Sequence, residues 1–141
     1  MINSEILSPT RRLQQKEHFR HLVQIAMSDG KIDSIEMKML NRMGINIGLS
    51  EFETQELIDS TCGTIYSPPE NKNIQFEQVY NMVQLILADG IVELGEMRLA
   101  YTFADAAGFD TDKIDYLLSF LLEGIKAGKN EHNLFVDYYS R

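Results

Sequence analysis

An acidic segment of eight residues occurs twice in this chain, sixty positions apart. Residues 29–36 read Asp-Gly-Lys-Ile-Asp-Ser-Ile-Glu, and residues 89–96 read Asp-Gly-Ile-Val-Glu-Leu-Gly-Glu. Both copies stand between segments whose apolar residues recur with the spacing of an α-helix. The chain is therefore predicted to be an internal duplication of one helical unit, built around two acidic turns.

The similarity between the halves extends beyond these turns. Residues 18–58 align with residues 78–118 without a gap, and the identical pairs include Val23/Val83, Gln24/Gln84, Asp29/Asp89, Gly30/Gly90, Glu36/Glu96, Met37/Met97, Gly48/Gly108 and Leu57/Leu117. A solenoid needs more repeats than two to bury the faces of its units. We therefore expect two three-helix units packed face to face.

Helical periodicity continues through nearly the whole chain. Neither a sustained alternation of period two nor an Asn-Gly hairpin signal predicts a strand. A length of 141 residues suits one domain with a single substantial core. The predicted fold is an all-α single domain over residues 1–141 with about seven helices. Its parts are repeat one at about 10–62, a loop at 63–72, repeat two at about 73–127, and a C-terminal helix at about 130–140.

Local signals place several helix starts and buried faces. The expected N-caps are Asp33, Ser50 and Asp110. The segment after Asp110 carries the most apolar stripe, which predicts that this helix lies at the centre of the core. Met39 falls off the main stripe of its helix, and His18 and His21 also fall away from a stripe, so we expect all three near the surface.

The net charge limits the partners that the chain is expected to bind. Lys and Arg number 13 and Asp and Glu number 21, which gives a net charge of −8. This charge opposes nonspecific attachment to nucleic acid or to an anionic membrane surface. Cations and basic protein partners are expected instead.

Cysteine usage and hydropathy indicate the compartment. The single cysteine, Cys62, has no second cysteine for an internal disulfide, which suits a reducing environment. No apolar run reaches the roughly 20 residues needed to cross a bilayer, and the first residues lack the pattern of a signal peptide. We expect a cytoplasmic protein with no direct membrane insertion.

The first acidic turn has a purely structural interpretation. Asp33 at an N-cap and Glu36 three residues later form the pattern of a capping box, in which each side chain accepts a hydrogen bond from the other residue's backbone amide. Such a cap stabilises a helix by about 1 kcal/mol. The second copy, with Glu93 in place of aspartate and Gly95 in the first turn, is a poorer cap.

The same turns also have a chemical interpretation. The segment matches the last eight positions of an EF-hand calcium loop, but apolar residues replace the first ligands, so one turn cannot supply the 6 to 8 oxygens that calcium prefers. Two turns brought together by twofold packing would pool six carboxylates around a divalent cation such as calcium, magnesium, manganese or zinc. The predicted ligands are Asp29, Asp33, Glu36, Asp89, Glu93 and Glu96. Both interpretations remain open at this point.

The repeated turns carry a family resemblance. Two copies of a helix ending in Asp-Gly, an aliphatic residue and a glutamate opening the next helix are followed by Gly48-Leu49-Ser50 and by Gly108-Phe109-Asp110. This pattern, over about residues 13–127, resembles the TerB-like family of tellurite-resistance proteins, a domain also seen in the central region of DjlA-type co-chaperones. The chain lacks a J-domain and its His-Pro-Asp tripeptide, so we do not expect co-chaperone activity.

The resemblance implies a bacterial all-helical domain of the same size, linked to tellurite and stress response, with no established catalysis. It also implies metal-binding acidic residues at Asp29, Glu36, Asp89 and Glu96. We therefore expect a non-enzymatic module for protein interaction, with partners that include membrane-associated stress-response components.

Two other functions are consistent with the same residues. One is a carboxylate-dependent, metal-assisted enzyme, although the chain shows no glycine-rich phosphate loop and no serine elbow. The other is a structural interaction domain without a metal. The aromatic segment 135–139 is expected to fold back on the core, and the alternative is that it forms a homodimer interface.

Overall fold

The computed structural model describes residues 9–28, 32–61, 63–88 and 94–140. Within these ranges the chain forms helices and no strand, which confirms the all-α prediction. The helices are α1 (Pro9–Ala26), α2 (Ser34–Asn46), α3 (Glu51–Thr61), α4 (Lys72–Ala88), α5 (Leu94–Ala107), α6 (Thr111–Lys126) and α7 (Glu131–Tyr139). None of these helices is both long enough and apolar enough to cross a bilayer.

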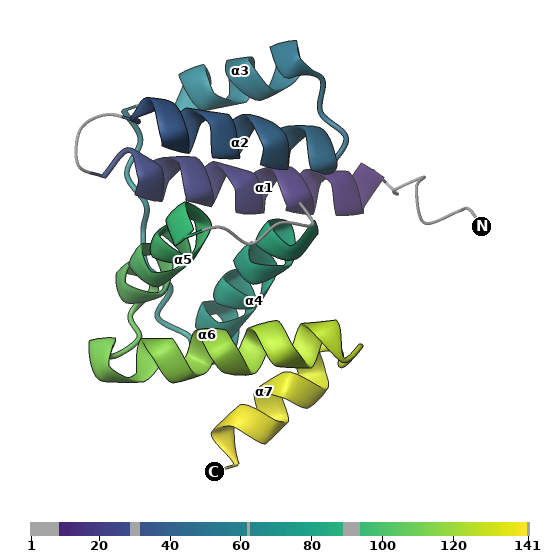
Figure 1. Ribbon diagram of the computed structural model, residues 1–141, viewed down its shortest axis with the longest axis vertical. Coiled ribbons are helices and arrows are strands. Elements are labelled where there is room, and N and C mark those ends of the chain that lie inside the picture. Colours follow the sequence, from purple (N-terminus) through teal and green to yellow (C-terminus); the bar gives the residue numbers. More distant parts are fainter. Residues whose placement is uncertain (1–8, 29–31, 62, 89–93, 141) are drawn as a thin grey trace.

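The two sets of three helices pack in corresponding ways (Figure 1). Helix α1 contacts α2 and α3, and α4 contacts α5 and α6. Between the sets, α1 packs on α5 while α2 packs on α4. The starts of α2 and α5 are sixty residues apart, as are the starts of α3 and α6. An exchange of the two sets therefore leaves the pattern of helix contacts unchanged.

The ends of α2 and α5 are closed by the same device. Gly48 and Gly108 have φ angles of 96° and 112°, a left-handed conformation that glycine adopts without a Cβ clash. The next residue in each case donates its amide hydrogen back to the helix: Leu49 to the carbonyl of Gly44 at 3.0 Å, and Phe109 to that of Ala104 at 3.1 Å. The sequence repeat thus corresponds to a repeat in local geometry.

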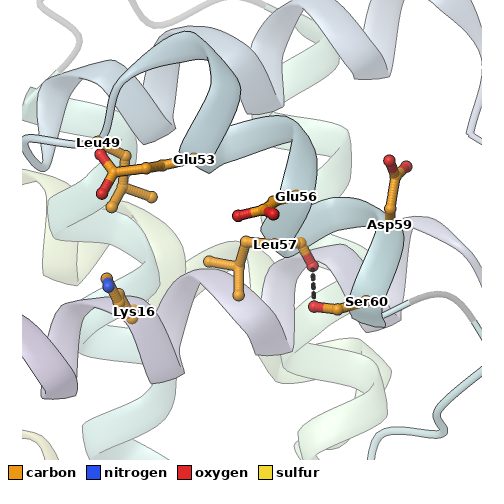
Figure 2. A pocket seen from close by; sticks show the side chains of 7 residues that line it. All are labelled: Lys16, Leu49, Glu53, Glu56, Leu57, Asp59 and Ser60. Carbon is orange, nitrogen blue, oxygen red and sulfur yellow. Dashed lines mark hydrogen bonds between the residues drawn. The ribbon is translucent and has the colours of Figure 1, made fainter.

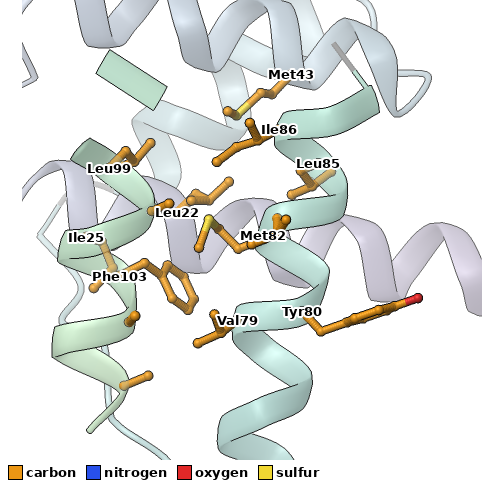
Figure 3. Close-up of a cluster of buried hydrophobic side chains, with 14 of the residues drawn as sticks. Leu22, Ile25, Met43, Val79, Tyr80, Met82, Leu85, Ile86, Leu99 and Phe103 are labelled. Atoms are coloured by element: carbon orange, nitrogen blue, oxygen red, sulfur yellow. The ribbon is translucent and has the colours of Figure 1, made fainter. Parts of the chain in front are cut away.

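Helix α4 occupies the centre of the core and contacts α1, α2, α5, α6 and α7. Its buried residues are Phe76, Val79, Tyr80, Met82, Val83, Leu85 and Ile86. Figure 3 shows Leu22 of α1, Met43 of α2 and Phe103 of α5 gathered along this helix. The prediction that the helix after Asp110 forms the centre is wrong, because α6 packs mainly on α4 and α5 with one apolar stripe.

The local capping predictions have mixed outcomes. Asp33 forms a complete capping box with Glu36, and Ser50 exchanges the same two bonds with Glu53, at 2.8 and 3.0 Å. Asp110 occupies the N-cap position of α6, but its side chain makes no capping hydrogen bond. Cys62 lies outside the described residues.

The prediction of a surface position for Met39 is wrong. Only 2% of its surface is exposed. Its sulfur would lie 3.4 Å from a Cβ placed on Gly95, so Met39 fills the contact between α2 and α5. The main apolar stripe of α2 does not include Met39. The prediction failed because α5 covers a second face of the helix, which the periodicity of α2 does not reveal.

Helix α7 folds back on the second set of helices, as expected. Leu134 is buried, and its side chain occupies the space beside Gly124 of α6. The ring of Phe76 lies 5.3 Å from the ring of Phe135 and 5.9 Å from that of Tyr139, measured between centroids. The alternative, a homodimer through this segment, stays untested.

The crossing of α2 and α3 generates a prediction about stability. A Cβ on Gly44 would lie 2.4 Å from Oγ1 of Thr54, a buried residue of α3. We expect Gly44→Ala to lower the free energy of unfolding by about 1–3 kcal/mol through overpacking. Gly95→Ala is the matched control, because its Cβ meets only ordinary contacts and alanine favours a helix by up to about 1 kcal/mol. Urea denaturation that shows equal stability for both variants would contradict the prediction.

Candidate functional site

A hollow of about 300 Å³ lies where the first turn of α2 meets α5 and the end of α1. It combines carboxylates, hydroxyls, a guanidinium and apolar side chains. Its lining residues are Ile25, Ala26, Ser28, Asp33, Ile35, Glu36, Met39, Gly95, Arg98, Leu99 and Thr102. Part of the first acidic turn and the beginning of α5 therefore border one space.

Both carboxylates of the first turn that border this hollow take part in the capping box. The amide of Glu36 donates to Oδ1 of Asp33 at 2.7 Å, and the amide of Asp33 donates to Oε1 of Glu36 at 3.2 Å. Asp33 is exposed and Glu36 is half-buried. The structural interpretation of these two residues is confirmed, and each carboxylate retains acceptor capacity because an ionised group offers about four lone-pair sites.

The glutamate of the second turn has a different environment. Glu96 is fully buried, and its Oε2 lies 3.4 Å from Nη2 of Arg42, which belongs to α2. Desolvation penalises a buried carboxylate strongly unless a cation or hydrogen bonds compensate for the lost water. Arg42 therefore supplies a cation from the first set of helices to the second acidic turn.

The two turns are unequal because their opposing residues differ. In the sixty-residue alignment Glu36 corresponds to Glu96, and Arg42 corresponds to Thr102. Thr102 lines the hollow that contains Glu36, whereas Arg42 pairs with Glu96. Glu96 is thus paired with Arg42 in the interior, whereas Glu36 shares a hollow with the hydroxyl of Thr102 and the guanidinium of Arg98.

Gly95 lies at the contact between α5 and α2. A Cβ at this position would already contact Met39 and lie 3.9 Å from Cγ2 of Ile35. Ile35 and Leu94 stand beside this contact and expose 65% and 76% of their surfaces. Two large apolar side chains are therefore presented to solvent next to the carboxylates.

Three of the six predicted ligands lie outside the described residues: Asp29, Asp89 and Glu93. Of the other three, Asp33 and Glu36 share the hollow, and Glu96 is buried on the neighbouring helix. Among the described residues, no three His, Cys, Asp or Glu side chains gather closely enough to hold a metal ion. The pooling of all six carboxylates stays a prediction.

The sequence did not indicate the part played by Arg42. Arg42 and Glu96 are 54 positions apart and belong to different repeats. The only signal in the sequence was the alignment of the repeats, in which Arg42 corresponds to Thr102. A difference in charge between otherwise similar halves could have drawn attention to this position.

His18 and His21 are half-buried rather than exposed. His18 lines a second hollow, of about 390 Å³, between α1, α2 and α4. Burial, with a smaller contribution from the nearby His21, lowers its pKa from 6.5 to about 4. His21 has its ring edge-to-face with Tyr66 at 5.4 Å, and burial also lowers its pKa. Both imidazoles contact other helices or loops, and the apolar pattern of α1 alone does not predict these contacts.

Comparison of the chain with protein-family models, with curated proteins and with solved structures gives no match. The resemblance to the TerB-like family therefore depends on the repeated turns and on the residues that follow them.

The contact between Arg42 and Glu96 generates a prediction. Arg42→Met leaves the buried Glu96 without this cation, and we expect the free energy of unfolding to fall by about 1–3 kcal/mol, a modest value because solvent partly screens the guanidinium. Adding Glu96→Gln to this variant should recover part of the loss, because an amide costs less to bury than a carboxylate. Arg98→Met, at an exposed position of α5, is the control. Additive effects in a double-mutant cycle would show that the pair is not coupled.

The environment of His18 generates a prediction about pH. Since its pKa is about 4 in the folded chain and 6.5 in the reference state, the unfolded chain binds more protons between these values. The free energy of unfolding should therefore fall as pH falls from about 6.5 towards 4, because unfolding takes up a proton. His18→Gln should flatten this slope, while the same change at the exposed His132 should leave it steep. Thermal melts across this range measure the effect, and equal slopes for both variants would contradict it.

Proposed function

We propose that this chain is a noncatalytic TerB-like module for protein interaction, formed by tandem duplication of a three-helix unit. The corresponding helix starts, the glycine turns after α2 and α5, and the exchangeable pattern of helix contacts support the duplication. The repeated Asp-Gly turns support the likeness to tellurite- and stress-response proteins.

The observation that carries this proposal is the meeting of α2 and α5 at one hollow. Asp33, Glu36 and the exposed Ile35 line it from the start of α2, and Arg98 and Gly95 line it from α5, where the exposed Leu94 directly precedes Gly95. Exposed apolar side chains rimmed by charged groups are typical of surfaces that bind other proteins. A site for a small substrate would enclose its ligand more completely.

A divalent cation at the paired turns is part of the proposal. The contact of Gly95 with Ile35 and Met39, between α5 and the start of α2, supports this part of the proposal. Asp29, Asp89 and Glu93 would then add carboxylates to those of Asp33 and Glu36. Such a cation would reduce the repulsion among these groups and hold the two halves in a fixed relation, which would keep the interaction surface rigid.

The competing functions have less support. A carboxylate-dependent enzyme would have to use Asp33 and Glu36 as its acid/base pair, and both of these side chains already accept backbone hydrogen bonds in the capping box. A structural domain without a metal is favoured by the capping box and by the contact between Arg42 and Glu96. That alternative predicts no response to cations.

The net charge of −8 supports partners that are basic proteins and opposes nucleic acid. A single cysteine supports a cytoplasmic location. Membrane-associated components of a stress response would be reached through protein contacts, because the described helices offer no bilayer span.

Thermal melting with cations tests the proposed site. We expect calcium, magnesium, manganese or zinc to raise the melting temperature, with a gain of about 2.7 kcal/mol when the cation concentration is roughly 100 times its dissociation constant. The gain should disappear in the double variant Asp29→Ala, Asp89→Ala. Calorimetric titration of the same samples should give one bound ion for the native chain.

A matched control removes two acidic residues elsewhere. Asp105→Ala with Asp115→Ala changes the net charge equally at exposed positions of α5 and α6, and this variant should respond to cations as the native chain does. A cation response that survives loss of Asp29 and Asp89 would place the site elsewhere. Destabilisation of the double variant with no ion response in any sample would favour capping alone.

A further inference from the structure

A third depression, the α1–α3 groove, runs between these two helices. It has a volume of about 540 Å³ and is lined by Lys16, Leu49, Glu53, Glu56, Leu57, Asp59 and Ser60. Figure 2 shows Lys16 on α1 across from Glu53 and Glu56, with Leu57 between the two helices. None of these residues lines the hollow at α2 and α5.

The corresponding place in the second half is occupied by α7. Under the sixty-residue alignment Lys16, Glu56 and Ser60 correspond to Phe76, Tyr116 and Phe120. These three aromatic residues hold α7: Phe76 and Phe120 have ring centroids 5.9 and 5.5 Å from that of Tyr138, and Tyr116 stacks on the same ring at 6.2 Å. The surface on which α7 packs, formed by Phe76, Tyr116 and Phe120, is called the seat of α7 below. It is the counterpart of the α1–α3 groove.

The two places have related shapes because the helices that form them pack alike. Helix α1 lies on α3 as α4 lies on α6, and Leu49 and Leu57 correspond to Phe109 and Leu117. Leu49 is 5% exposed and Leu57 is half-buried, so they form an apolar floor. Within the described part of the chain, no helix covers this floor in the way that α7 covers its own seat (Figure 1).

The charges of the two places differ. Beside α7, the ammonium groups of Lys72, whose Nζ lies 4.8 Å from the ring centroid of Tyr139, and of Lys113 are balanced by the carboxylates of Asp110 and Asp112. Helix α7 itself contains Glu131 and Asp137 and no lysine or arginine. In the α1–α3 groove Glu53 replaces Lys113, and Glu56 and Asp59 add two further carboxylates against the one ammonium group of Lys16.

We propose that the α1–α3 groove binds a basic amphipathic helix of a partner protein. The apolar side of that helix would cover Leu49 and Leu57, and its lysines or arginines would lie beside Glu53, Glu56 and Asp59. Phe52, 71% exposed and one turn before Glu56, extends the apolar contact. This inference names a partner class for the proposed interaction module and rests on that proposal, but it does not depend on a cation at the acidic turns.

A second copy of the chain is a poor occupant. Its α7 would bring Glu131 and Asp137 towards three carboxylates, and like charges at close range repel. The groove is also shorter than the seat of α7, because α3 ends at Thr61 whereas α6 continues to Lys126. The groove therefore has no counterpart of the space beside Gly124 that Leu134 fills. A bound helix would contact only the positions that correspond to Phe76, Tyr116 and Phe120, which are Lys16, Glu56 and Ser60.

Selection from a display library of short amphipathic helices, ranging from acidic to basic, tests this inference with the full chain as target. We expect the enriched sequences to be basic. Their synthetic peptides should bind about tenfold or more weakly to the variant Glu56→Lys, Asp59→Lys, because charge reversal turns attraction into repulsion. The variant Asp105→Lys, Asp115→Lys makes the same change in net charge at exposed positions outside the groove, and its affinity should stay close to native.

Chemical-shift mapping locates the bound peptide. The inference expects amide shifts at Leu49, Leu57 and Ser60. Three results would overturn the inference: enrichment of acidic sequences, equal loss of peptide affinity in both charge-reversed variants, or amide shifts confined to Ile35 and Leu94. The third result would be consistent with an interaction module that uses a different surface. Absence of any enriched helix would also overturn it, and cation-dependent melting would still report separately on the acidic turns. Self-association of the native chain that Glu56→Lys, Asp59→Lys abolishes would identify a second copy as the occupant instead.

Discussion

Burial of α4 between the two halves of the chain is the interaction on which the other features depend. Each set of three helices has an apolar side that only the other set covers, and α4 contacts helices of both. Roughly 25 cal/mol is gained for each Å² of apolar surface removed from water, so buried side chains of α4 such as Met82 and Ile86, which lie beside Leu22 and Met43, fix the relation of the sets (Figure 3). That relation in turn places α5 against the first turn of α2.

The pairing of similar halves creates functional differences at corresponding positions. Arg42 pairs with Glu96, while its counterpart Thr102 leaves Glu36 beside an open hollow. Phe76 and Tyr116 hold α7, while their counterparts Lys16 and Glu56 line a groove. Because the helices of the two halves pack alike, these differences in side-chain chemistry distinguish the surface that α7 covers from the corresponding groove between α1 and α3.

Features that depend on neighbours in sequence were predictable. The capping boxes at Asp33 and Ser50 need only residues three positions apart. Predictions that depended on distant packing were less successful: Met39 was assigned to the surface but is buried against α5, and His18 is half-buried in a hollow that α4 also lines. The N-cap at Asp110 also differs, because the residue type favours a cap without guaranteeing that its side chain makes the bond.

The helices, most of their ends and the repeated turns follow from local sequence, because helix periodicity, caps and glycine turns are properties of residues within a few positions of one another. Which charged groups meet depends instead on how the helices pack. Arg42 contacts Glu96, which is 54 positions away in the sequence, and α7 covers only one of two corresponding surfaces. Both features depend on packed helices that bring residues distant in sequence together. The candidate site is therefore predictable in its residue types, whereas its electrostatic balance follows from the fold.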